Sequence, residues 1–160
     1  MKIRKFTSIA AFVFLVGLVA LQGTAARADL HIGKWRLNLG KSKTASGQAP
    51  KSETRTYEQQ GNVVKITVEG VGPDGIPIAY GYTIFDDGRG APVTGYAASG
   101  ADSAEVKRID ANTTETVFKK AGKPVGGTRS VVSKDGKILT VTSLDANGQP
   151  TGNVLVFDKL

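Results

Sequence analysis

The sequence predicts an all-β protein, a single antiparallel up-and-down β-barrel of about eight to ten strands. After His31 the chain consists of short segments with β-strand character, and no stretch has the period of an amphipathic helix. Pairs such as Asp135-Gly136 and Asn147-Gly148 separate the segments, and Gly and Asn accept the positive φ that tight turns require. A long meander with one buried face closes most easily into a barrel, because closure leaves no exposed edge.

Ten segments are expected to form strands. Alternation is clearest at 64–68, where Val64, Ile66 and Val68 share one face and polar side chains take the other. It recurs in Leu139-Thr140-Val141. The expected strands are 34–39, 53–59, 63–69, 78–85, 92–97, 104–109, 114–119, 127–133, 138–143 and 153–159.

The first 28 residues have the form of a secretory signal peptide. Three basic residues precede an apolar run at 9–21, and Ala26-Arg27-Ala28 supplies small residues for cleavage before Asp29. The run is shorter than the roughly 20 residues that span a bilayer, and no cysteine follows it to carry a lipid. The sequence therefore predicts a signal peptide at 1–28, one barrel domain at 29–160, no membrane anchor after cleavage, and a periplasmic or extracellular location.

The charge of the mature chain predicts no nucleic-acid partner. Removal of the leader's four basic residues leaves 17 basic and 14 acidic residues among 132, a net charge of +3. These charges are scattered, whereas nucleic-acid binding needs a concentrated basic face. The chain has no cysteine, which excludes thiol chemistry and cysteine-bound metal.

Turn lengths predict one closed end and one open mouth. If every connection reverses the chain, one end collects the short turns at 61, 87–90, 110–112 and 134–137. The other end collects connections that are mostly longer, at 40–52, 70–77, 98–103, 121–126 and 144–152.

Gly33-Lys34-Trp35, at the start of the first expected strand, resembles the N-terminal signature of the lipocalins and their calycin-type relatives. The resemblance implies that Trp35 plugs the closed end of a lipocalin-like barrel and that an arginine from a late strand stacks across it, a cation–π contact. Arg129 is the expected partner, so Gly33, Trp35 and Arg129 would together close the barrel. The long loop at 40–52 matches the large mouth loop of lipocalins. Segments 51–54, 106–110 and 133–137 add a similarity to small exported bacterial lipocalin-like proteins.

Three residues are candidate ligand contacts: Tyr80, Tyr82 and Arg108. The two tyrosines share a face with Ile78 and Ile84, so their phenols would either hydrogen-bond a ligand or simply fill the core. Arg108 shares a face with Val106, where it would either receive an anion or extend to solvent.

No arrangement of residues predicts catalysis, a metal site or a cofactor. His31 is the only histidine, and its place beside the cleavage site predicts a solvated N-terminal residue. The carboxylates fall mostly at turns or on polar faces, and no nucleophile and base can be paired from the sequence.

Two functions follow. The first is an exported, non-enzymatic barrel that binds or carries a small, partly apolar or amphiphilic ligand. The alternative is a protein-binding module with a filled core, like the exported bacterial barrels that inhibit proteases.

Overall fold

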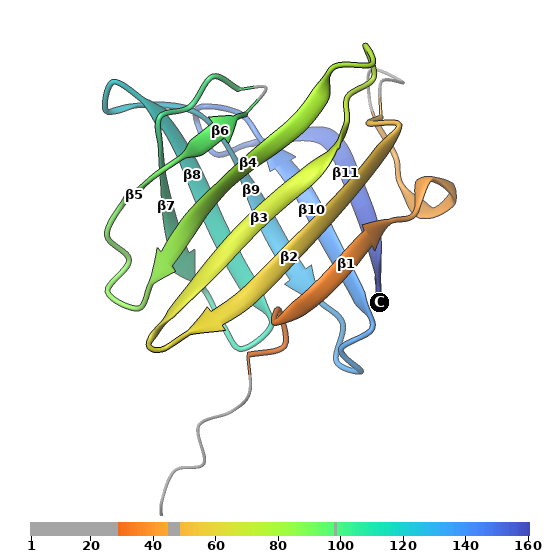
Figure 1. Cartoon of the computed structure of the whole chain (residues 1–160), viewed down its shortest axis with the longest axis horizontal. Helices are drawn as coiled ribbons and strands as arrows, with labels where there is room; N and C mark the ends of the chain where they lie inside the picture. The colour runs from red at the N-terminus through yellow and green to blue at the C-terminus, as the bar shows by residue number, and fades with distance from the viewer. Residues whose placement is uncertain (1–28, 45–48, 98) are drawn as a thin grey trace, which may run out of the picture.

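The chain folds into one antiparallel sheet of eleven strands that curls into a nearly closed barrel (Figure 1). This computed structural model describes residues 29–44, 49–97 and 99–160, so the predicted signal peptide and its cleavage site lie outside the described residues. The strands are β1 (Gly33–Leu37), β2 (Ser52–Gln60), β3 (Val63–Val71), β4 (Pro77–Phe85), β5 (Ala91–Pro92), β6 (Thr94–Tyr96), β7 (Ser103–Arg108), β8 (Thr113–Lys120), β9 (Lys123–Val132), β10 (Ile138–Leu144) and β11 (Pro150–Lys159).

The all-β prediction is confirmed, because the described residues contain no helix beyond the 3-10 turn η1 (Leu39–Lys41). None of the described helices could span a bilayer. Strands β1 to β4, orange to green in Figure 1, form the wall that faces the viewer, and β8 to β11 form the opposite wall. The strand order is β5-β7-β8-β9-β10-β11-β1-β2-β3-β4-β6, so the two edge strands are consecutive in the chain.

The strand count differs from the prediction of eight to ten because the expected strand at 92–97 is divided. Ala91 and Pro92 pair with β7, while Thr94, Gly95 and Tyr96 pair with β4. The chain crosses between the two partners at Val93, whose N–H donates to the Asp102 carbonyl. Strands β4 and β7 consequently share no ladder of hydrogen bonds, so the barrel is nearly but not fully closed at this seam.

One predicted mouth loop is wrong. The connection expected at 121–126 is the two-residue turn Ala121-Gly122, in which both residues have positive φ. Strand β9 therefore begins at Lys123, and the β8–β9 ladder shifts register after Phe118. The first loop, between Leu37 and Ser52, remains the long connection at this end.

The core lies inside the barrel, where alternate side chains of each strand pack together. Val64, Ile66 and Val68 of β3 point inward, as predicted, and are at most 7% exposed. Leu139 and Val141 of β10 face them from the opposite wall as part of the same buried cluster.

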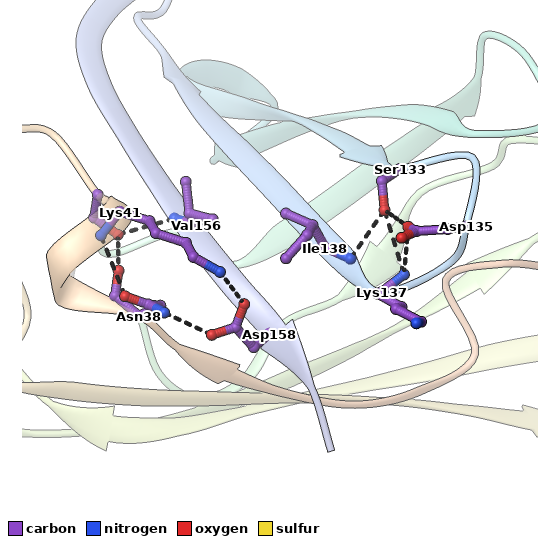
Figure 2. Close-up of polar contacts among 9 residues, drawn as sticks. Asn38, Lys41, Ser133, Asp135, Lys137, Ile138, Val156 and Asp158 are labelled. Atoms are coloured by element: carbon purple, nitrogen blue, oxygen red, sulfur yellow. Dashed lines mark hydrogen bonds and ion pairs between the residues drawn. The ribbon is translucent and has the colours of Figure 1, made fainter.

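Side-chain hydrogen bonds fix two turns against the barrel (Figure 2). Asn38 Nδ2, just before η1, and Lys41 Nζ, from its last residue, both donate to the Asp158 carboxylate of β11, at 2.6 and 2.9 Å. In the β9–β10 turn, Ser133 Oγ accepts from the backbone N–H of Ile138 at 3.0 Å. The first loop is thereby tied to the last strand.

Candidate functional site

A pocket of about 440 Å³ opens at the predicted mouth of the barrel. This volume lies within the usual range for small-molecule sites. The pocket is lined by parts of β2, β4, β6, β8, β9 and β10 and by the loops beside them. Its apolar walls include Ile76, Ile78, Tyr96, Phe118, Val125 and Leu144. Ile76 and Tyr96 stand at the rim, about half exposed.

The pocket also has a charged pair, Glu53 and Arg55 of β2. Residues two apart on a strand share a face, so both side chains point into the barrel. Arg55 Nε donates to Glu53 Oε1 at 2.6 Å, and the two side chains are only 7% and 6% exposed. On its other side the guanidinium lies 5.1 Å from the centre of the Phe157 ring. Such a pair is costly to bury, because both charges lose hydration.

Tyrosines surround this pair. The Tyr57 hydroxyl accepts a hydrogen bond from Arg55 and hydrogen-bonds Ser130. Tyr80 lines the pocket, whereas Tyr82 is fully packed and hydrogen-bonds Thr116. Both Tyr80 and Tyr82 meet Phe118 edge to face, with ring centres 6.3 and 5.7 Å apart. Of the two predicted tyrosines, Tyr80 is thus available to a ligand, and Tyr82 fills the core.

Burial changes the acid–base properties of these groups. Loss of hydration raises the pKa of Tyr80 to about 12 and raises the pKa values of Tyr57 and Tyr82 as well. Burial opposes the charged form of Arg55, but the Glu53 carboxylate and the surrounding tyrosines together outweigh it, and the pKa of Arg55 is raised. The phenols are therefore neutral hydrogen-bonding groups and Arg55 is a permanent cation.

At the opposite end, Trp35 plugs the barrel. Its side chain is fully buried, and its Nε1–H donates to the His31 carbonyl at 2.8 Å. The cation over the indole is Lys159 of β11, with Nζ 4.9 Å from the ring centre. Gly33 fits beneath this lysine because its φ is +134° and an added Cβ would lie 2.8 Å from Lys159 Cε.

The prediction that Arg129 stacks on Trp35 is wrong. On β9 the inward positions are Ser130 and Val132, so Arg129 points outward and is half exposed. Its guanidinium bonds Glu115 of the neighbouring strand.

His31 is not the solvated residue that the sequence predicts. It is 2% exposed, and both its backbone N–H and its Nδ1 lie 3.0 Å from Asp29 Oδ1. The other Asp29 oxygen accepts from Arg108 at 2.5 Å. Arg108 therefore anchors the N-terminal segment at the closed end, far along β7 from the mouth. Of the two roles left open for it, its side chain extends toward solvent, 48% exposed, and does not lie inside the barrel.

A second cavity, of about 710 Å³, lies along the seam where β4 and β7 are unpaired. Most of its charged side chains form ion pairs: Asp87 with Arg89, Glu105 with Lys119, Glu115 with Arg129, and Arg108 with Asp29. Compared with this second cavity, the mouth pocket alone joins apolar walls to a buried polar pair. The described residues contain no cluster of three or more metal-ligating side chains.

Sequence reasoning missed Glu53 and Arg55 because β2 carries polar residues on both faces. The signal that would have found them is register. The two-residue turn at Gly61-Asn62 pairs Gln60 with Val63, which sets Arg55 opposite Val68. Because Val68 points into the core, Arg55 must do so as well.

Comparison with known protein families, curated proteins and solved structures finds no match to this chain. The antiparallel, nearly closed barrel is established by the structure, and the lipocalin resemblance remains a prediction.

Proposed function

We propose that this protein binds a small, partly apolar molecule in the mouth pocket and acts as an exported, non-enzymatic carrier or binding protein. The observation that carries the proposal is a pocket of about 440 Å³ whose apolar walls enclose the buried Glu53–Arg55 pair. Binding sites for small molecules commonly join apolar walls to a few fixed polar groups that orient the ligand.

The pocket favours this function over the alternative of a protein-binding barrel with a filled core. A filled interior would leave no volume at the mouth, whereas Tyr80, Phe118 and Leu144 border open space. The exposed apolar residues Ile76 and Tyr96 stand at the rim of that same space, where they would contact a ligand on its way in.

The experiment is native mass spectrometry on mature protein purified gently from its own source. We expect a retained small molecule, lost on denaturation, whose mass identifies it. Thr128→Trp is the test variant, because Thr128 lines the pocket from β9 and an indole there would occupy the space. Val131→Trp is the matched control, since Val131 lies on the same strand but is exposed.

The proposal predicts that wild type and Val131→Trp retain the molecule and that Thr128→Trp does not. A barrel that is empty in repeated preparations, or equal retention by Thr128→Trp, would contradict it.

A further inference from the structure

The two charged groups at the inner end of the mouth pocket have a net charge of zero. Glu53 and Arg55 contribute one negative and one positive charge, held together at 2.6 Å and almost fully buried. Among the described residues of the lining, Asp74 is the one other charged residue. It is exposed on the β3–β4 loop, where its carboxylate accepts from the Ile76 N–H.

This balance decides which ligand head groups the pocket tolerates. A carboxylate placed at the pair is attracted by Arg55 and repelled by Glu53, and an ammonium meets the reverse. In either case the charged head group also loses its hydration, a cost that one favourable contact offsets poorly when an opposing charge lies beside it.

A neutral group that both donates and accepts hydrogen bonds meets no such conflict. It can donate to the Glu53 carboxylate and accept from the Arg55 guanidinium, which carries five N–H donors. Hydrogen bonds to charged partners are the stronger kind. The neutral phenol of Tyr80 adds a further hydrogen-bonding group to the same wall.

Resting on the function proposed above, we infer that the ligand is an uncharged amphiphile whose apolar body contacts the pocket walls. Its head group, such as a primary amide or an alcohol, bonds Glu53 and Arg55 together. The pair thus selects against fatty carboxylates and alkylammonium ions, even when their apolar body is the same as that of the neutral ligand.

The inference can be distinguished from a purely structural role for the pair. Replacing a buried ion pair by apolar residues is often neutral or stabilising, so stability alone does not require the pair. If the pair were purely structural, neutralising one partner would leave the head-group preference of the pocket unchanged. A selecting pair would change that preference, because loss of one charge exposes the other.

The test uses four probes with one alkyl chain and different head groups: primary amide, primary alcohol, carboxylate and ammonium. Affinities are measured by calorimetry on wild type, on Glu53→Gln, and on Glu58→Gln as the control. Glu58 lies on the same strand but is exposed. We expect wild type and Glu58→Gln to bind the amide and alcohol about tenfold or more tightly than either ion. In Glu53→Gln the uncompensated Arg55 should make the carboxylate the preferred probe.

The wild-type ranking alone tests the inference even if Glu53→Gln does not fold. A wild-type preference for either ion would overturn the inference while leaving the proposed function standing, and so would an unchanged ranking in folded Glu53→Gln. If none of the four probes binds wild type, the proposed function fails, and the inference fails with it.

Discussion

Asp29 ties the N-terminal segment to the closed end of the barrel. Its carboxylate accepts hydrogen bonds from His31 and from Arg108, and only 15% of its side chain is exposed. Burial by itself would raise the pKa of this carboxyl, but the two partners outweigh it and hold the pKa well below the ordinary value of 3.8. Asp29 therefore stabilises the folded state in its ionised form.

Replacing Asp29 tests this role. We expect Asp29→Asn to lower the free energy of unfolding by about 1–3 kcal/mol at pH 7, because charge-assisted hydrogen bonds are lost. A carboxyl with a depressed folded pKa stabilises above its unfolded pKa and loses that contribution as the pH falls. The difference between wild type and Asp29→Asn should therefore shrink below about pH 4, as measured by urea unfolding at pH 7 and pH 3.

Asp87→Asn is the control for Asp29→Asn, because Asp87 forms an exposed pair with Arg89 and exposed pairs contribute little to stability. An equal gap between wild type and Asp29→Asn at both pH values would contradict the role assigned to the ionised carboxylate.

At the scale of single residues, the sequence predicted apolar and aromatic positions better than charged ones. Tyr80 and Tyr82 point inward as expected from their place between Ile78 and Ile84. Arg129 was placed on the wrong face because its neighbours, Thr128 and Ser130, are small and polar and give no alternation. His31 was misplaced because burial of an N-terminal histidine depends on long-range contacts, here with Tyr57, 5.9 Å away between ring centres.

At the scale of strands, the positions of the β segments could be predicted but some of their connections could not. The segment at 92–97 divides because Pro92 lacks an N–H and Gly95 has a φ of +85°, and pairing changes partner between them. The turn Ala121-Gly122 was missed because alanine rarely adopts positive φ, here 49°.

The closed end is fastened by the last strand, β11, and not by β9. Lys159 lies over Trp35, and Trp35 pairs with it in the ladder between β1 and β11. We expect Lys159→Ala to lower the free energy of unfolding by about 0.5–1 kcal/mol, the usual range for an exposed cation–π contact.

Tryptophan fluorescence measures this change directly, because Trp35 is the sole tryptophan of the chain. Lys159→Ala should alter the emission of the folded protein, and Arg129→Ala should leave it unchanged, since Arg129 binds Glu115 on the outer face. The reverse pattern would restore the arrangement that the sequence predicted.

At the scale of the whole molecule, the two ends of the barrel differ in construction. One end is sealed by Trp35, His31 and the Asp29–Arg108 anchor, while the other keeps a pocket with a buried ion pair. Turn lengths indicated which end is open, but they could not reveal the pocket's polar groups, because those depend on register across β2 and β3.

The claim that the mouth pocket holds a small molecule can be tested by NMR titration of isotope-labelled protein. The protein is titrated with an alkyl amide and, separately, with the matching carboxylate. We predict that at least one probe shifts the Arg55 Nε–H signal and the backbone amides of Ile78, Tyr80 and Gly127, while signals of His31 and Arg108 at the closed end stay in place. Shifts confined to the outer surface, or no shifts with either probe, would contradict the claim.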